Sequence, residues 1–223
     1  MNKLVEYVEL TTGPDPKGTV IWMHGLGADG WDFVPIVKEL GLAEDLPVRF
    51  IFPHAPMREV TLNNGRVMRA WYDIAMSELQ RLPDEKGIRE SQAQIEALME
   101  REKARGVASD KIVLAGFSQG GAIALHAGLR HPEPLAGILA LSTYLTLPES
   151  LAAEAASANK SVAIFMIHGT QDPVIPITLA KTSRDILRSL FYKVRWVEYP
   201  MPHSVSMEEI IAVGEWLSER FKS

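Results

Sequence analysis

A serine, an aspartate and a histidine occur along the chain in settings that suit acyl transfer. Ser118 is the centre of Gly116-Phe117-Ser118-Gln119-Gly120, a G-x-S-x-G pattern whose glycines allow a sharp turn that exposes the serine at a strand end. Asp172 and His203 follow later, each in a loop rich in glycine or proline. A serine hydroxyl becomes a nucleophile when an imidazole accepts its proton and a carboxylate orients that imidazole. The three residues therefore predict a Ser-His-Asp catalytic unit.

The acid and the base have rivals in the sequence. Asp172 precedes Pro173 in a turn, where aspartate is also common for purely local reasons. His24 and His168 each precede a glycine at the end of a predicted strand, where they can support loops through hydrogen bonds. His203 is favoured as the base because its loop follows the strand after the acid and precedes the last helix.

Strand and helix patterns alternate along the chain and should bring these residues together. Short apolar runs predict buried strands, and the segments between them carry helical periodicity or capping signals. The expected strands are 4–10 at an edge, 19–23, 48–52, 111–115, 136–141, 162–167 and 193–199, and the expected helices are 31–40, 88–105, 122–130, 148–158, 175–190 and 206–221. This alternation predicts an α/β fold with a central, mostly parallel sheet and helices on both faces. Reactive groups in such folds gather at the carboxyl ends of the strands.

A glycine-rich loop at residues 24–30 is a second candidate functional segment. It follows a predicted strand, where backbone N–H groups can face a developing negative charge. An ordinary strand-to-helix turn explains the same glycines. The loop alone therefore leaves both interpretations open.

The stretch between residues 53 and 88 lacks helical periodicity, which is more typical of a functional loop than of a connection. Asn63-Asn64-Gly65 within it predicts a tight hairpin, because Asn-Gly readily adopts positive φ angles. Leu62, Met68, Trp71 and Tyr72 are candidate walls of an apolar pocket for an acyl chain. Aromatic residues in a hairpin equally often cover the core.

Composition limits the remaining possibilities. The 223 residues, 47% of them hydrophobic, are enough for one sizeable core and predict a single domain over residues 1–223. A net charge of −5 without a Lys/Arg cluster disfavours nucleic acid as a partner. The absence of cysteine excludes disulfides and thiolate catalysis, and no closely spaced set of His, Asp or Glu residues predicts a metal site.

Membrane insertion and secretion are not expected. The first 18 residues mix charged and apolar side chains and contain no uninterrupted hydrophobic region of signal-peptide type. The longest apolar stretch, residues 135–147, is too short to span a bilayer. We therefore expect a cytoplasmic protein without integral membrane association.

Taken together, the motifs resemble those of the phospholipase/carboxylesterase family of α/β-hydrolases, which includes the acyl-protein thioesterases. The resemblance covers nearly the whole chain. It rests on His24-Gly25-Leu26-Gly27 with Asp29-Gly30, Pro53-His54-Ala55-Pro56, Arg69-Ala70-Trp71-Tyr72-Asp73-Ile74, Gly116-Phe117-Ser118-Gln119-Gly120-Gly121, His168-Gly169-Thr170 with Asp172, and His203-Ser204. One departure is local: a glycine often stands near the catalytic histidine in this group, whereas here Pro200 and Pro202 bracket Met201.

The resemblance implies an α/β-hydrolase fold without a large lid domain and without a cofactor. It implies Ser118 as nucleophile, His203 as base, Asp172 as acid, and the backbone N–H groups of Leu26 and Gln119 as the oxyanion hole. It implies a serine carboxylesterase that hydrolyses esters or thioesters of short to medium acyl chains, and it allows a homodimer. Still open are the physiological substrate (a small ester, a lysophospholipid or an S-acylated protein), peptidase activity, and a non-catalytic acyl-binding role on the same fold.

Overall fold

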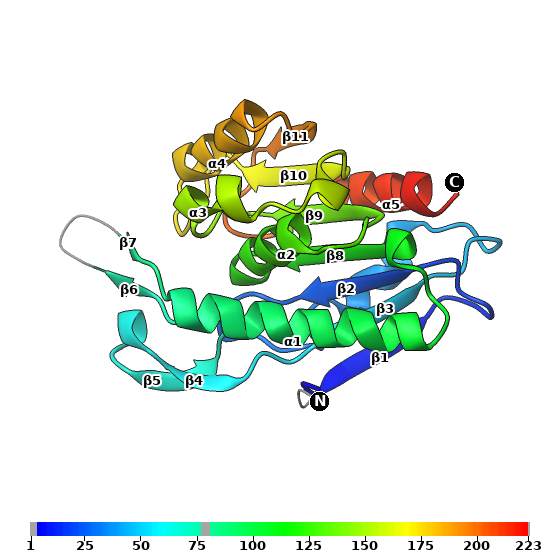
Figure 1. The fold of residues 1–223 in the computed structure, drawn as a ribbon, viewed down its shortest axis with the longest axis horizontal. Coiled ribbons are helices and arrows are strands. Elements are labelled where there is room, and N and C mark those ends of the chain that lie inside the picture. Colours follow the sequence, from blue (N-terminus) through cyan, green and yellow to red (C-terminus); the bar gives the residue numbers. More distant parts are fainter. Residues whose placement is uncertain (1–3, 77–80, 223) are drawn as a thin grey trace.

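A seven-stranded sheet forms the centre of the molecule (Figure 1). The computed structural model describes residues 4–76 and 81–222. In spatial order the strands are β1 (Tyr7–Thr11), β3 (Arg49–Pro53), β2 (Thr19–Met23), β8 (Ile112–Phe117), β9 (Gly137–Leu141), β10 (Ile164–Gly169) and β11 (Val194–Tyr199). Only the edge strand β1 runs antiparallel to its neighbour; the other strand pairs of this sheet are parallel. The prediction of a mostly parallel sheet is confirmed.

Helices cover both faces of the sheet. The α-helices are α1 (Glu85–Ala104), α2 (Gln119–Arg130), α3 (Pro148–Glu154), α4 (Ile177–Ser189) and α5 (Met207–Phe221). Short 3-10 helices are η1 (Val34–Leu40), η2 (Thr61–Asn63), η3 (Ser109–Lys111) and η4 (Ser157–Asn159). Buried residues of α1, α2 and α4 form one apolar cluster, and those of η1 and α5 form a second cluster across the sheet. None of the described helices is long and apolar enough to cross a membrane.

Strand β2 shows how the sheet separates the two clusters. Its side chains alternate, so that Ile21 and Met23 pack in the cluster of α1 and α2, whereas Val20 and Trp22 pack with η1 and α5. All five residues of β2 are buried. Burial on both faces explains why the central strands appear in the sequence as continuous apolar runs. The single domain over residues 1–223 stays a prediction.

The segment expected as a helix over residues 31–40 is not α-helical. Residues 31–33 form a turn and Val34–Leu40 form the 3-10 helix η1. The Val34 N–H donates to the Trp31 carbonyl and the Ile36 N–H to the Phe33 carbonyl, three residues back in each case. Gly41 ends η1 with a φ of 63°. Close packing on α5 explains the departure, because a Cβ at Gly214 would overlap the Leu40 carbonyl. Tertiary contacts override the helical pattern here.

Other boundaries differ in smaller ways. Helix α1 begins three residues before the expected start, because the Asp84 side chain caps it by accepting a hydrogen bond from the Gly87 N–H at 2.9 Å. The predicted hairpin is present between β4 (Met57–Val60) and β5 (Arg66–Arg69), with Asn64 and Gly65 at φ of 57° and 71°. A second, short pair consists of β6 (Ala75–Met76) and β7 (Arg81–Leu82).

The first turn of α5 contains a buried carboxyl group. The Ser206 hydroxyl accepts a hydrogen bond from the Glu209 N–H at 3.2 Å, as expected for a helix cap. The Glu209 side chain is buried near the Ser206 backbone, but its oxygens make no hydrogen bond of normal geometry to any described residue. Burial raises the pKa of Glu209 from 4.5 to about 8.

This raised pKa predicts a specific pH dependence of stability. Folded Glu209 keeps its proton below about pH 8, whereas the unfolded chain releases it above 4.5, so the folded state binds the additional proton between these values. Its contribution to the free energy of unfolding therefore falls as pH rises through this window, by up to about 1.4 kcal/mol per pH unit. We expect Glu209→Gln to remove this decline and to be more stable than the wild type at pH 8.5.

Urea-unfolding free energies at pH 4.5 and pH 8.5 test this expectation. Glu208→Gln is the matched control, because Glu208 lies in the same helical turn but is exposed. Parallel pH profiles for Glu209→Gln and the wild type would mean that Glu209 is ionised in the folded protein.

Candidate active site

Ser118 lies at a sharp turn between β8 and α2. Its φ of 56° and ψ of −120° are unusual for a residue with a side chain, and such backbone strain costs about 1–3 kcal/mol. The turn is held by the Ser118 N–H, which donates to the Leu141 carbonyl at 2.9 Å, and by the Thr143 hydroxyl, which donates to the Ser118 carbonyl at 2.6 Å. The strand-turn-helix geometry is that of a nucleophile elbow.

Two glycines of the motif are required by close packing at this turn. A Cβ at Gly116 would overlap the backbone of Gly120, and a Cβ at Gly120 would overlap the carbonyl oxygens of Met23 and His24. The first turn of α2 therefore rests directly on the end of β2. No larger residue fits at either position without moving the backbone.

His203 connects Ser118 to Asp172. Its Nε2 lies 2.9 Å from Ser118 Oγ, and its Nδ1 lies 2.6 Å from Asp172 Oδ2. The other Asp172 oxygen, Oδ1, accepts hydrogen bonds from the N–H groups of Val174 and Ile175, both at 2.8 Å. With Nδ1–H donating to the carboxylate, Nε2 is left to accept the serine proton. The structure thus brings the three residues together at the carboxyl ends of the strands.

His168, at the end of β10, supports the loop that carries Asp172. Its Nε2–H donates to the Ile175 carbonyl at 2.8 Å, and the same nitrogen lies 3.5 Å from Asp172 Oδ2. Burial lowers the pKa of His168, so the ring is held in its neutral form. The neutral His168 ring, with its proton on Nε2, therefore bonds the Asp172 loop at Ile175 without placing a positive charge of its own beside the Asp172 carboxylate.

The loop of His203 is bonded to the loop of Asp172. The Thr170 N–H donates to the Tyr199 carbonyl at 2.8 Å, and the Gln171 N–H donates to the Met201 carbonyl at 3.1 Å. A Cβ at Gly169 would overlap the Met201 carbonyl. The proline-containing sequence around Met201 therefore still places its carbonyls against the acid loop, which fixes the two loops relative to each other.

The backbone N–H groups of Leu26 and Gln119 are the expected oxyanion donors. Neither donates to a protein acceptor among the hydrogen bonds of the described residues, and both residues line the cavity that contains Ser118. The Gly27 N–H donates to the Arg69 carbonyl at 2.9 Å and thereby fixes the loop around Leu26. Two unpaired donors beside a nucleophile are what an oxyanion hole requires.

The His24 side chain supports the loop that carries Leu26. Its Nδ1–H donates to the Gly25 carbonyl at 2.7 Å, and its Nε2 accepts from the Ala55 N–H at 3.0 Å. Burial lowers the pKa of His24 to about 4, which keeps the ring neutral, as one donor and one acceptor nitrogen require. The expectation that His24 and His168 support loops through hydrogen bonds is confirmed.

A cavity of about 260 Å³, called the inner cavity below, contains the Ser118 side chain. Leu62, one of the predicted pocket residues, lines it and is 49% exposed. Tyr72, another predicted pocket residue, also lines it, as do Tyr144 and Ile175. Tyr144 could not be found from the sequence, because it follows β9 without a motif, and its only signal is its place after a strand end.

Trp71 and Met68 do not line the inner cavity. Trp71 is 0% exposed and belongs to the core; its Nε1–H donates to the His24 carbonyl at 2.9 Å. Met68 lies on the hairpin, where its sulfur accepts a hydrogen bond from Asn63 Nδ2 at 3.2 Å. The interpretation of these two residues as pocket walls is therefore not supported by their positions, whereas the alternative that the aromatic residue covers the core describes Trp71.

The side chain of Gln119 has a structural task that the motif does not reveal. Its Oε1 accepts a hydrogen bond from the Trp71 N–H at 2.7 Å, and its Nε2 donates to the Tyr72 carbonyl at 2.6 Å. Both bonds are buried. Gln119 thus anchors the segment that carries Tyr72 beside the nucleophile.

Comparison with known proteins decides the family. The model of the phospholipase/carboxylesterase family matches residues 8–220. The chain belongs to this family. It is 42% identical to acyl-protein thioesterase 1 of Neurospora crassa over 211 residues, which cover 91% of this chain and 86% of that protein. Acyl-protein thioesterase 1 of Yarrowia lipolytica is 38% identical over 209 residues, 92% of each chain.

Solved structures agree with this assignment. The crystal structure of Arabidopsis thaliana SOBER1 superposes with a TM-score of 0.86 at 29% identity, covering 91% of this chain and 98% of that one. The α/β-hydrolase fold without a large lid domain is therefore confirmed. Membership in the phospholipase/carboxylesterase family identifies the protein as an ester hydrolase.

The close packing at Gly120 generates a prediction. Gly120→Ala should push the start of α2 away from β2 and displace both Ser118 and the Gln119 N–H. Misplacement of reacting groups by about 1 Å can cost about 10²-fold in rate. We expect kcat/KM for p-nitrophenyl butyrate to fall by at least about this factor.

Gly13→Ala is the control. A Cβ at Gly13 would lie 3.2 Å from Pro47 Cβ, and both residues are far from the elbow in the sequence. Circular dichroism establishes that both variants fold. Wild-type activity in a folded Gly120→Ala protein would contradict the role given to this contact.

Proposed function

We propose that this enzyme hydrolyses carboxylic esters and thioesters of short to medium acyl groups, with Ser118 as nucleophile, His203 as general base and Asp172 as the acid that orients it. The observation that carries the proposal is the hydrogen-bonded series from Ser118 Oγ through both nitrogens of His203 to Asp172 Oδ2. No cofactor enters the reaction, because the serine oxygen itself supplies the nucleophile.

The proposed cycle follows from these positions. His203 Nε2 takes the Ser118 proton while Oγ attacks the acyl carbonyl, and the resulting oxyanion accepts hydrogen bonds from the N–H groups of Leu26 and Gln119. One such donor contributes on the order of 3 kcal/mol of transition-state stabilisation. His203 then protonates the departing alcohol or thiol. Water, activated by the same imidazole, releases the acid from the acyl-enzyme.

A second candidate concerns the acyl carrier. The relatives named acyl-protein thioesterase 1 support S-acylated proteins as physiological substrates of this chain as well. Small esters, lysophospholipids and S-acylated proteins present the same carbonyl to Ser118, so the catalytic geometry does not distinguish them. Hydrolysis rates for an ester, a thioester and a lysophospholipid with one common acyl group would separate these substrate classes.

The proposal includes a cytoplasmic location, since a chain without cysteine needs no oxidising compartment. Assembly as a homodimer is compatible with the proposed mechanism, because every proposed catalytic group comes from one chain. A purely acyl-binding role is disfavoured by the aligned serine, imidazole and carboxylate. Covalent labelling by a fluorophosphonate distinguishes an enzyme from a binding protein.

Removing the nucleophile should abolish turnover. We expect Ser118→Ala to lower kcat for p-nitrophenyl butyrate by about 10⁴-fold or more, because the members of a catalytic unit act together. The same variant should lose fluorophosphonate labelling. Ser204→Ala, which removes a different hydroxyl from the loop that carries His203, is the control. Turnover or labelling that survives in Ser118→Ala would refute the assignment.

The orienting role of Asp172 is tested by an isosteric change. In Asp172→Asn the amide oxygen keeps the hydrogen bonds from the Val174 and Ile175 N–H groups, so the amide NH2 faces His203 Nδ1 and donates to it. The imidazole then carries its proton on Nε2, which is the wrong tautomer for a base. We expect kcat to fall by about 10⁴-fold with little change in thermal stability. Asp185→Asn on the surface of α4 provides the matched control. Equal kcat values for Asp172→Asn and the wild type would exclude Asp172 as the acid.

A further inference from the structure

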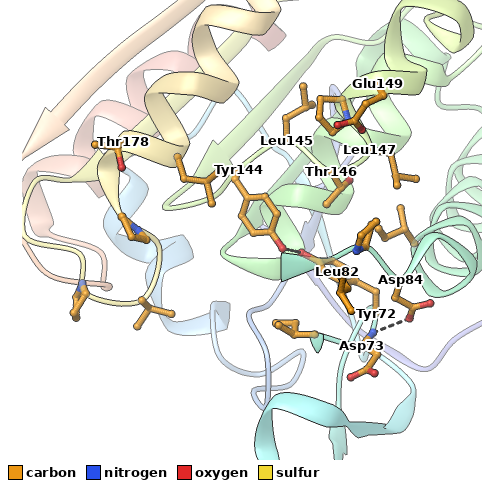
Figure 2. Close-up of a pocket in the computed structure, with 18 residues that line it drawn as sticks. Tyr72, Asp73, Leu82, Asp84, Tyr144, Leu145, Thr146, Leu147, Glu149 and Thr178 are labelled. Atoms are coloured by element: carbon orange, nitrogen blue, oxygen red, sulfur yellow. Dashed lines mark hydrogen bonds between the residues drawn. The ribbon is translucent and has the colours of Figure 1, made fainter. Parts of the chain in front are cut away.

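A second and larger cavity adjoins the inner cavity. This outer cavity has a volume of about 630 Å³, and Figure 2 shows its lining side chains. Its walls come mainly from the segment around β7, the first turn of α1, the chain between β9 and α3, and the start of α4. Apolar side chains predominate, among them Ile88, Leu145, Leu147 and Leu179. Such walls suit a hydrocarbon chain.

Tyr72 and Tyr144 lie at the boundary between the two cavities. Both residues line the inner cavity and the outer cavity. Their hydroxyl groups are hydrogen-bonded to each other at 2.9 Å, and Figure 2 shows the two side chains meeting along this bond. Ile74 and Val174 also line both cavities, so the two tyrosines form part of the boundary that a ligand extending from Ser118 into the outer cavity crosses.

The two tyrosines are carried by segments bonded to the nucleophile elbow. The Tyr72 carbonyl accepts the buried hydrogen bond from Gln119 Nε2, and Thr143, next to Tyr144, donates to the Ser118 carbonyl. The boundary is therefore fixed relative to the reacting oxygen. Chain length measured from the scissile carbonyl determines whether an acyl group reaches it.

We propose that the hydrogen-bonded pair Tyr72–Tyr144 is a gate that sets the acyl-length preference of the enzyme. Short acyl groups fit in the inner cavity while the pair stays closed, and longer groups separate the hydroxyls and enter the outer cavity. This inference rests on the proposed function, because it assumes an acyl group attached at Ser118.

The physical effect of the gate is a fixed penalty for long chains. An inner cavity of about 260 Å³ is smaller than the range of roughly 300–1,000 Å³ typical of ligand sites. Each methylene that moves from water to the apolar walls beyond the gate favours binding by up to about fourfold. Opening the pair first sacrifices one hydrogen bond, whose net value corresponds to about 2- to 12-fold.

The test is a series of p-nitrophenyl esters from acetate to laurate, each below its critical micelle concentration. The double variant Tyr72→Phe/Tyr144→Phe removes both hydroxyls and with them the hydrogen bond that joins the pair. We expect the ratio of kcat/KM for laurate to that for acetate to rise by about 2- to 12-fold. Tyr144→Ala, which also removes a ring, should raise this ratio by at least about tenfold.

Tyr192→Phe is the matched control. Its hydroxyl is buried and lines neither cavity, so the length profile should stay at the wild-type ratio. Thermal unfolding establishes whether the variants fold. If Tyr144→Ala does not fold, the double phenylalanine variant alone tests the gate. An unchanged ratio in the double variant overturns the gate.

Failure of the gate and failure of the proposed function give different results. If acetate hydrolysis depends on Ser118 but the double variant keeps the wild-type length profile, only the gate is wrong. If acetate hydrolysis does not depend on Ser118, the proposed function is wrong and the gate falls with it. A changed ratio together with Ser118-dependent hydrolysis supports both.

Discussion

The contact between the first turn of α2 and the end of β2 is the constraint on which the site depends. Gly120 lies against the Met23 and His24 carbonyls, at a distance that excludes any side chain. Together with the hydrogen bonds at the Ser118 N–H and carbonyl, this contact sets the strained backbone conformation of Ser118. It also brings the Gln119 N–H to the loop that carries Leu26. The relative positions of the nucleophile and the proposed oxyanion donors therefore depend on this backbone contact. The hydrophobic packing of the sheet offsets the strain in the Ser118 backbone.

Two buried, neutral histidine rings position the loops around this contact. His24 fixes the Leu26 loop, and His168 fixes the loop of Asp172; each ring uses one nitrogen to donate to a carbonyl. Burial lowers the pKa of both rings, so neither adds a positive charge beside the catalytic groups at neutral pH. His203 differs because both of its nitrogens face functional side chains rather than backbone groups. Similar side chains thus have different roles because of what surrounds them.

The sequence was sufficient for features that local patterns determine. The G-x-S-x-G pattern between an apolar run and a helical run marks the turn at Ser118, and the chain order of Ser118, Asp172 and His203 follows from the order of the parallel strands. Features that depend on packing between distant segments were not predictable. The 3-10 helix at residues 34–40 packs closely against α5, and the buried Trp71 has its backbone N–H bonded to the Gln119 side chain. Neither interaction leaves a periodic signal in the sequence.

Gln119 connects the two ends of the proposed acyl site. Its backbone N–H is available beside the reacting serine, while its side chain holds the segment of Tyr72 through two buried hydrogen bonds. Movement of the Tyr72 backbone would therefore disturb a proposed oxyanion donor. Tyr72 is only 3% exposed, whereas Tyr144 is partly exposed. Rotation of the Tyr144 side chain opens the pair without moving Gln119, so a long acyl group can enter the outer cavity while the catalytic geometry is preserved.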